Sequence, residues 1–513
     1  MRLSRLVLDE NGHSVTFITM MVQQATGVGS QGHAQATLPE LAGRQRTTVL
    51  FVCCLGLFLV GLDTTVVIIA LPSIGRDFGV GIDALQWTIG AYTLVMASLL
   101  MLAGSAADRV GRKHVFVAGL MVFSLGSLLC SAAPNVGLLV AFRVLQAVGG
   151  AMVNPVAMAI ITTTFTDPRE RAQAVGVRGA VFGVSMALGP IVGGALSSTF
   201  GWRSIFWINL PLGLVAVLLA VRLVPETRAS APRRIDPVGQ LLVFVLLTTL
   251  TYAIIQAPAQ GWSAPVILAA FAAAGGALLG LLGYEPRRPQ PLIDLRFFRS
   301  IPFASAIVTS IIAFAAFGGF LFLSTLYLQD ARGLSPVQAG LAIVPMAGMI
   351  AVVSPVSGRI VGRRGPRVPL VVAGLCGATA CLMLTAIGPD TSLAWLLGAY
   401  VVFGVGVGFV NAPITNTAVS GMPRDQAGVA SALATSSRNV GQTLGVALVG
   451  ALVTSHLGQA GRGNVASATH TSWWLLTACG LGVLLLGATA TTRRAEASAR
   501  RTAAQLNPQA LSA

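Results

Sequence analysis

One acid and one arginine stand inside stretches of the chain that are otherwise almost wholly apolar. Asp63 lies within "LFLVGLDTTVVIIALP", and Arg143 lies within "GLLVAFRVLQAVGG". A charge in the hydrocarbon layer of a membrane costs roughly 3 kcal/mol or more, so such residues usually mark ion or proton pathways. Burial opposes the ionisation of an acid and a nearby guanidinium favours it, whereas arginine keeps its own proton. These two residues are therefore predicted to couple proton movement to function; the alternative is a buried pair with a structural role only.

Other polar side chains occur at similar depth and are candidates for lining a substrate cavity: Gln146, Asn154, Asn411, Asn416, Arg438 and Gln442. For most of them a hydrogen bond between helices, worth under about 1 kcal/mol, is the simpler role. Asn154 and Asn411 occupy matching places in an internal repeat, which favours the cavity for these two. Arg438 could neutralise an anionic substrate or a partner acid, or be structural. Arg178 is nearer a helix end, where its long side chain can reach the membrane interface, so no function is predicted for it.

Membrane helices are needed to hold these residues, and the composition supports them. The chain of 513 residues is 54% hydrophobic and only 10% charged, with a mean hydropathy of +0.78. Apolar stretches long enough to cross a bilayer recur along it. They centre near residues 60, 96, 124, 150, 186, 213, 247, 274, 314, 347, 378, 405, 440 and 481. The sequence thus predicts an all-α, polytopic membrane protein with about 14 transmembrane helices.

Basic residues set the predicted orientation of these helices. They collect on one side, in loops such as "DRVGRK", "TRASAPRR" and "GRRGPR", while only Arg76, Arg203, Arg332 and Arg462 fall on the other. By the positive-inside rule the first side is cytoplasmic, and both termini lie there. Tryptophans at the predicted outer helix ends are expected to form an interfacial belt: Trp87, Trp202, Trp262, Trp395, Trp473 and Trp474. We expect a multi-pass monomer in the cell membrane, in contact with membrane lipids and without a nucleic-acid partner.

An internal repeat explains the number of helices. "VNPVAMAIITTTFTDPRERAQA", from Val153, resembles "VNAPITNTAVSGMPRDQAGVA", from Val410, and both end in a Pro-Arg-acid turn (168–170 and 423–425). The offset of about 255 residues corresponds to eight helices, so the repeat is parallel and two extra helices lie between its halves. The predicted parts are a disordered cytosolic tail over 1–46, a six-helix bundle over 47–223, a linker with two additional helices over 224–299, a second six-helix bundle over 300–491 and a cytosolic tail over 492–513.

The predicted cytoplasmic loop after the second helix carries a specific spacing. It reads "GSAADRVGRKH" and contains Gly104, Asp108, Arg109, Gly111, Arg112 and Lys113. A basic loop with a helix cap would be the simple interpretation. The spacing resembles the signature of the major facilitator superfamily, in which this loop is a latch between the two bundles. The second half has only a degenerate counterpart, "SPVSGRIVGRRGPR".

Three more stretches resemble motifs of the 14-helix drug:proton antiporters within that superfamily: "LDTTVVIIALP", "RVLQAVGGA" and "GVRGAVFGVSMALGPIVGG". The last contains the residues of the antiporter motif, Gly176, Gly189, Pro190, Gly193 and Gly194, with Ser185 in place of a glycine, while Ala147 replaces a glycine of the second stretch. The resemblance implies the major facilitator fold in a 6+2+6 arrangement. It also implies efflux of small lipophilic compounds such as drugs or antibiotics, driven by protons through alternating access. The first and fourth helices are neighbours in that family, and Asp63 and Arg143 lie at similar depth, roughly 10 to 13 Å below the outer surface.

Other classes of function find little support in the sequence. The chain has no nucleotide-binding loop, and its cysteines and histidines form no metal-ligand pattern, so we expect no cofactor, no metal and no catalytic residue. An enzyme would need a constellation of acids, histidines or cysteines facing a cavity. The alternatives to a drug exporter are a dedicated exporter of one endogenous metabolite and a non-transporting membrane receptor.

Overall fold

The structure is a computed structural model, and it describes residues 7–8, 14–15, 43–228, 236–288, 291–388, 390–420, 427–460, 465–490 and 492–506. These residues belong to two units, Met1–Gln45 and Arg46–Ala513. In the first unit, strand β1 (Val7–Leu8) pairs antiparallel with strand β2 (Ser14–Val15). The predicted disordered tail over 1–46 lies mostly outside the described residues, as does the turn at 423–425 of the repeat.

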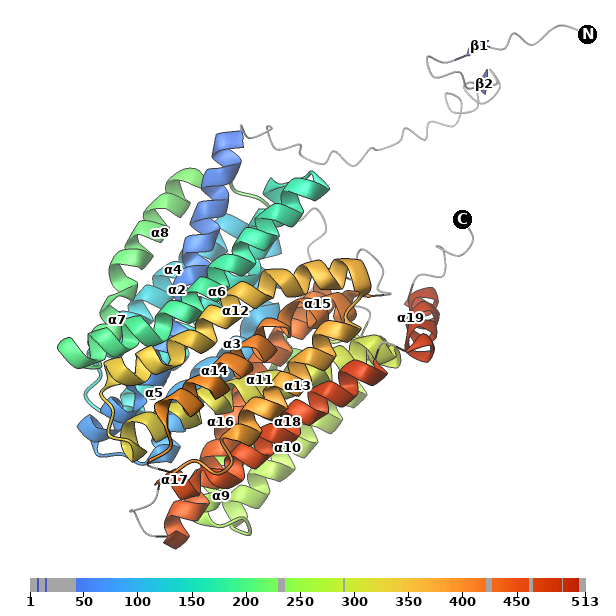
Figure 1. The fold of residues 1–513 in the computed structure, drawn as a ribbon. Coiled ribbons are helices and arrows are strands. Elements are labelled where there is room, and N and C mark those ends of the chain that lie inside the picture. The colour runs from blue at the N-terminus through green and yellow to red at the C-terminus, as the bar shows by residue number, and fades with distance from the viewer. Residues whose placement is uncertain are drawn as a thin grey trace, which may run out of the picture. The chain divides into compact units, whose positions relative to one another are not determined.

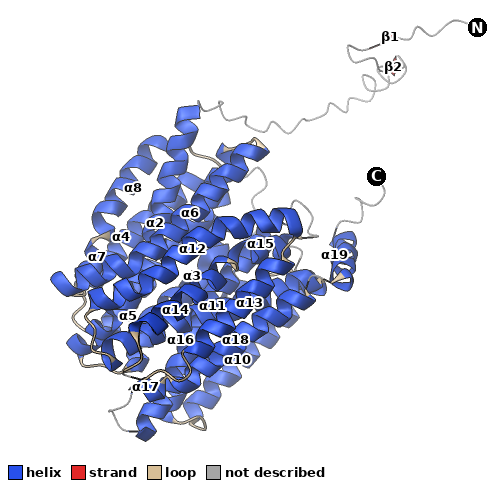
Figure 2. Cartoon of the chain, in the orientation of Figure 1, coloured by secondary structure: helices blue, strands red, loops and turns tan. Residues whose placement is uncertain are grey.

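Every other regular element that the structure describes is helical (Figure 2). The first half contains α2 (Gly43–Phe78), α3 (Ile82–Val110), α4 (Arg112–Ser131), α5 (Val136–Thr164), α6 (Pro168–Thr199), the short α7 (Ser204–Trp207) and α8 (Asn209–Leu223). The linker contains α9 (Pro237–Gln260), α10 (Pro265–Tyr284) and the 3-10 turns η1 (Glu285–Arg287) and η2 (Leu295–Arg299). The second half contains α11 (Ile301–Leu326), the π-helical turn η3 (Tyr327–Ala331), α12 (Pro336–Arg364), α13 (Arg367–Met383), α14 (Leu393–Gly408), α15 (Asn411–Val419), α16 (Ala427–Ala460), α17 (Val465–Ala468), α18 (His470–Thr489) and α19 (Arg493–Leu506).

Local signals set several helix starts. The side chains of Asn135, Ser300 and Ser392 accept hydrogen bonds from backbone N–H groups in the first turns of α5, α11 and α14. Ser335 and Gln338 form a reciprocal capping box at the start of α12, followed by a proline at its first position. Such caps satisfy backbone donors that have no partner within the helix.

The membrane-spanning character of the chain is confirmed, and the number of spans stays a prediction. Among the described residues, twelve helices are long and apolar enough to cross a membrane. The shorter α13 is apolar as well, and α16, which carries more polar residues, is not among the twelve. Each of the 14 centres predicted from the sequence lies in a different helix. An all-α, polytopic fold therefore follows from both sequence and structure.

The two halves meet on the side predicted to face outward. There, α6 packs closely against α12: Gly194 lies against Pro336 and Gly340 lies against Pro190, with no room for a Cβ at either glycine. A second seam joins α3 to α16, where the hydroxyl oxygens of Thr93 and Thr443 are 2.6 Å apart. Glycine allows helices to approach to backbone contact in the absence of a hydrophobic driving force. The outer halves of the two bundles are therefore closed upon each other.

Toward the predicted cytoplasmic side the same helices separate. A Cβ placed at Gly176, Gly179 or Gly183 of α6 would meet nothing within 4 Å, and the same is true of Gly348 and Gly358 of α12. Figure 1 shows α6 and α12 side by side at the lower left and diverging toward the upper right. Helices α6 and α12 are thus in backbone contact near the predicted outer end and lie apart near the predicted cytoplasmic end.

Helix α9 of the linker contacts both halves of the protein, and the C-terminal helix α19 contacts the second half. In α9, Gln240 donates to the carbonyl of Ser98 on α3, while Ile254 and Ile255 pack against Ala447 and Ala451 of α16. In the predicted cytosolic tail, Ser498 of α19 accepts a hydrogen bond (3.0 Å) from the backbone of Ile301 at the start of α11.

The predicted tryptophan belt is only partly present. Trp262, Trp395 and Trp474 are exposed, but Trp202 and Trp473 are 4% and 1% exposed, so the prediction is wrong for these two. Trp202 packs edge to face on neighbouring phenylalanine rings and donates to Asp77 (3.0 Å), and Trp473 packs against Phe320. Hydropathy indicates the depth of a residue along a helix but not which side of the helix it faces.

Candidate functional site

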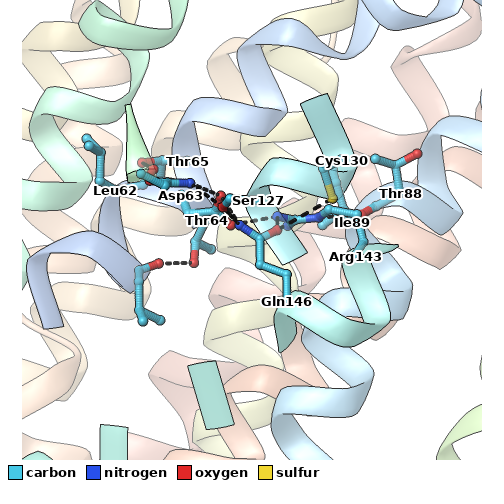
Figure 3. Close-up of polar contacts among 12 residues, drawn as sticks. Leu62, Asp63, Thr64, Thr65, Thr88, Ile89, Ser127, Cys130, Arg143 and Gln146 are labelled. Atoms are coloured by element: carbon cyan, nitrogen blue, oxygen red, sulfur yellow. Dashed lines mark hydrogen bonds and ion pairs between the residues drawn. The ribbon is translucent and has the colours of Figure 1, made fainter. Parts of the chain in front are cut away.

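The two charges singled out in the sequence form one buried ion pair. Arg143 Nη1 of α5 lies 2.6 Å from Asp63 Oδ2 of α2, and both side chains are 1% exposed (Figure 3). The pair lies within the first bundle, where α2, α3, α4, α5 and α8 converge. Removing one partner of such a pair leaves an uncompensated buried charge, a loss of about 3 to 5 kcal/mol.

Amide side chains hold the second oxygen of the carboxylate. Gln146 Nε2 and Asn209 Nδ2 both donate to Asp63 Oδ1 at 2.9 Å. The same two amide nitrogens also donate to Ser127 Oγ of α4, at 2.5 and 2.9 Å. Asp63 therefore accepts three hydrogen bonds from three different residues, one of them from the charged guanidinium of Arg143.

Arg143 is held from several directions as well. Its Nη1 donates to Gln146 Oε1 (2.6 Å), its Nε donates to the carbonyl of Thr88 (3.3 Å), and its guanidinium carbon lies 4.0 Å from the centre of the Tyr92 ring. A guanidinium over an aromatic face gains a cation–π attraction that is strongest away from water. The arginine thus keeps several partners besides Asp63, and these partners remain available if the carboxylate becomes protonated.

Small residues bring the helices close enough for this network. A Cβ at Gly126 of α4 would lie 2.6 Å from Gln146 Cα, and a Cβ at Gly150 of α5 would lie 2.9 Å from Met96 Sδ and 3.1 Å from the Tyr92 hydroxyl oxygen. Larger residues at these places would push α5 away from α4 and α3. Gly126 of α4 and Gly150 of α5 therefore let α5 approach closely enough for Arg143 and Gln146 to reach Asp63.

The glycine-proline run of α6 connects this bundle to the other. On one side Gly189 packs on Thr65 and Gly193 on Val66, directly after Asp63 in α2. On the other side the run packs on the first turns of α12. A small cavity lies beside this seam and is lined by Thr65, Met186, Phe317, Leu321, Met346 and Ile350, among others. The helix segment that follows the buried acid is therefore in contact with the surface that closes the outer side.

The remaining cavity candidates have different surroundings. Asn154 accepts a hydrogen bond from Arg178 (2.9 Å), and Asn411 accepts one from Arg438 (2.7 Å). Gln146 belongs to the Asp63 network, and Gln442 is buried against Gly318 of α11. Asn416 is exposed. The assignment of these residues to a substrate cavity stays a prediction.

The cytoplasmic loop motif is bound within the first bundle. Asp108 pairs with Arg112 (3.0 Å), and Gly111 has a φ of 124°, a conformation that favours glycine. The cap at the start of α4 comes from Glu226, which accepts from the backbone N–H of Lys113 (3.2 Å) and was not singled out in the sequence. The loop is therefore anchored to the segment after α8. Its role as a latch to the second bundle stays a prediction.

Sequence reasoning also missed Asn209, Ser127, Thr88 and Tyr92. Ser127, Thr88 and Tyr92 are ordinary residues of apolar helices, and only the three-dimensional packing points to them. Asn209, in "WINLP", carried a signal, because it is an amide within an apolar run. Among the described residues no group of three or more His, Cys, Asp or Glu side chains is placed to hold a metal ion.

A polytopic helical fold with a buried ion pair among its apolar helices is the kind of architecture found in membrane transporters. Residues 53–446 match the family model described as Major Facilitator Superfamily. The chain belongs to this superfamily, whose members are transporters.

Several relatives are resistance proteins. The chain is 38% identical over 416 residues to the multidrug resistance protein Stp of Mycobacterium tuberculosis, covering 81% of this chain and 77% of that protein. It is 36% identical to the tetracenomycin C resistance and export protein of Streptomyces glaucescens, over 83% of this chain and 79% of that protein.

A solved structure of low sequence identity confirms the fold and carries no information on the substrate. A bacterial homologue of the human lysosomal transporter Spinster, in an inward-facing and occupied conformation, superposes with a TM-score of 0.62 at 18% identity. The match covers 90% of this chain and 98% of that protein.

Proposed function

We propose that this protein is a proton-coupled exporter, an antiporter of small lipophilic compounds such as drugs or antibiotics. The observation that carries the proposal is the carboxylate of Asp63, fully buried yet held by Arg143 and two amides. If the carboxylate had no titratable role, it would add little to the stability of the protein, because an apolar core of similar volume is often as stable as a buried ion pair. The names of the relatives at 36% and 38% identity support drugs or antibiotics as the substrate class.

Proton exchange at Asp63 supplies the driving force in this proposal. When the outer side opens, water reaches the carboxylate and a proton neutralises it. Arg143 then keeps its bonds to Gln146 and to the carbonyl of Thr88, so that its charge is not left without partners. When the inner side opens, the proton leaves and the three donors again stabilise the anion. Asp63 moves the proton, and Arg143 positions and stabilises its ionised form.

Contact through α6 would link this exchange to the outer closure. Gly189 and Gly193 of α6 press on α2 just after Asp63, while Pro190 and Gly194 of the same helix press on α12. A change in the packing of α2 on protonation would therefore reach the seam that closes the outer side. In interfaces packed this tightly, small shifts switch between two discrete arrangements.

Two other functions remain as alternatives, a dedicated exporter of one endogenous metabolite and a receptor that transports nothing. A receptor has no need for a carboxylate that titrates, whereas either exporter does. Cytoplasmic termini, a monomeric state and residence in the cell membrane are part of the proposal. The distribution of basic residues supports the orientation, and the apolar helices support the membrane location.

Drug susceptibility separates these functions. An efflux-deficient bacterial host expresses the wild type, Asp63→Asn, or no transporter, and growth is measured in tetracenomycin C and in the lipophilic cation ethidium. We expect the wild type to raise the inhibitory concentration of at least one compound and Asp63→Asn to abolish the effect at equal expression. Resistance that survives Asp63→Asn would contradict the coupling role, and the absence of any drug phenotype would favour a dedicated exporter or a receptor.

A further inference from the structure

Two buried acids meet at the predicted cytoplasmic end of the linker helices. Asp236 directly precedes α9 and is 8% exposed, and Glu285 directly follows α10 and is 0% exposed. A Cβ at Gly239, in the first turn of α9, would lie 2.6 Å from Glu285 Oε1 and 2.8 Å from Asp236 Oδ2. Both oxygens therefore lie within 2.8 Å of one point beside Gly239. The space that a side chain at Gly239 would fill is the place where the two carboxyl groups face each other.

One oxygen of each acid has hydrogen-bond donors, and the other has none. Asp236 Oδ1 accepts from the backbone N–H of Gly239 (3.0 Å) and from the hydroxyl of Tyr284 (3.1 Å). Glu285 Oε2 accepts from the backbone N–H of Ile293 (3.4 Å). Asp236 Oδ2 and Glu285 Oε1, the two oxygens beside Gly239, are buried and have no hydrogen-bond partner among the residues that the structure describes. Two buried acceptors without a donor are unfavourable, and each needs a partner.

No basic side chain of the described ranges supplies that partner. Neither Asp236 nor Glu285 forms an ion pair within 4.0 Å in this part of the chain. The charges that act on Glu285 are those of Asp236 and Arg288, but Arg288 Nε donates to the Tyr284 hydroxyl instead (2.6 Å). Arg287 donates to the carbonyl of Gly283. Two buried carboxylates this close together cannot both stay ionised without a cation between them.

We propose that Glu285 and Asp236 form a proton-binding site in the linker, separate from Asp63. Glu285 Oε1 carries the proton and donates it in a hydrogen bond to Asp236 Oδ2. The proton belongs to Glu285 because two donors on Oδ1 stabilise the ionised form of Asp236, whereas Glu285 has one long contact on Oε2. A single proton thus gives both unpartnered oxygens a hydrogen bond. The site goes beyond the proposed export function and does not depend on it.

The proton holds the linker helices together and onto the first half. It joins the start of α9 to the end of α10 and, through Ile293, to the segment that leads into α11. Gln240, the next residue of α9, donates to the carbonyl of Ser98 on α3. When the pH on the predicted cytoplasmic side rises and the proton leaves, two negative charges face each other and push α9 away from α10. The contact between α9 and α3 thereby becomes sensitive to cytoplasmic pH.

Infrared spectroscopy detects this proton directly. Full-length protein in dodecyl maltoside, a detergent without a carbonyl group, is titrated from about pH 5 to about pH 9, and the carbonyl stretch of protonated carboxylic acids is recorded beside the midpoint of thermal unfolding. We expect the wild type to lose an acid band and its midpoint to fall by a few degrees as the pH rises, because the folded protein holds a proton that the unfolded chain gives up. Glu285→Gln should lack this band. Its midpoint at about pH 9 should exceed that of the wild type, since the amide donates to Asp236 as the protonated acid does.

Matched variants separate this site from other acids. Asp294→Asn is the control, because Asp294 lies in the segment beside Glu285 and pairs with Arg296 (2.8 Å), so this variant should titrate as the wild type does. Asp63→Asn should keep the band as well, whatever its effect on export, so the linker site and the proposed coupling can fail independently. A band that disappears in Asp63→Asn and persists in Glu285→Gln would overturn the linker site.

Two further arms test the shared proton itself. Asp236→Asn removes the neighbouring charge, so the acid band should disappear at lower pH than in the wild type. This arm also serves if Glu285→Gln does not fold, and a titration that is unchanged in Asp236→Asn would contradict the pair. Removal of the band by millimolar magnesium at constant pH would overturn the proton in favour of a divalent cation held by the two carboxylates.

Discussion

Replacing Asp63 by asparagine is the most direct perturbation of the buried network. The change removes one charge but keeps the size of the side chain and one oxygen acceptor for the three donors that now reach the carboxylate. Exchange of one proton for a neutral substrate across 100 mV supplies about 2.3 kcal/mol, which sustains a concentration ratio of about 50. Without a titratable group the ratio should fall to 1. The unpaired charge of Arg143 should also lower the free energy of unfolding by about 3 kcal/mol.

The assay uses proteoliposomes with an imposed pH difference and membrane potential, loaded with whichever compound the wild type exports in cells. Accumulation of the compound at steady state is measured for the wild type and for Asp63→Asn, and thermal unfolding is followed in parallel. Asp77→Asn is the matched control, because Asp77 lies on the same helix and forms an exposed pair with Arg203 (2.8 Å). That control should accumulate the compound normally and lose under about 1 kcal/mol of stability. Uphill accumulation by a folded Asp63→Asn protein would refute the coupling role of the carboxylate.

Three further perturbations follow from the packing. Asn209→Leu removes the amide that donates to both Asp63 and Ser127. The free energy of unfolding should fall by about 1 to 3 kcal/mol, and uphill accumulation of the compound should weaken. Both are measured in the same proteoliposome preparation. Gly340→Ala places a methyl group against the carbonyl of Pro190, so we expect the outer closure to loosen and a cysteine-labelling reagent to gain access from outside; unchanged labelling would mean that the seam can absorb the methyl group. Thr93→Cys combined with Thr443→Cys, where the hydroxyl oxygens are 2.6 Å apart, should form a disulfide under oxidation that stops export and is reversed by reductant.

Depth along the helices was the part of the site that the sequence could predict. Counting residues from the helix ends placed Asp63 and Arg143 at similar levels, and the structure joins them at 2.6 Å. Counting gave no information on rotation about the helix axis. Arg178 was therefore assigned to the membrane interface, although its side chain turns inward to Asn154, and Trp202 was assigned to a belt, although it is buried. Which face a residue presents depends on neighbours that are distant in the sequence.

Residues outside the motifs were missed for a related reason. Asn209 is the first residue of α8, and no role was predicted for it although it is an amide within an apolar run. The break between α7 and α8 instead places it inside the bundle at 1% exposure, against Asp63. Glu226 follows the end of the same helix and caps α4 from across the bundle. Both residues act over more than 100 positions of sequence separation, which a search for local spacing does not detect.

The repeat also indicates why the proposed proton site at Asp63 belongs to only one half of the chain. At an offset of 257 residues, which also relates Asn154 to Asn411, Asp63 corresponds to Phe320 and Arg143 corresponds to Tyr400, and both rings are buried. In place of an ion pair, Tyr400 packs edge to face on Phe320 (5.4 Å), which stacks on Phe403 (3.7 Å). Such an aromatic cluster gains from burial and has no group that changes charge between pH 5 and 8. An arginine-asparagine pair is present in each half, whereas among the described residues a buried carboxylate paired with arginine is found in the first half alone. A transporter built in this way would bind substrate between two similar faces while a single bundle senses the proton, so a change in protonation makes one half move against a partner that stays unchanged.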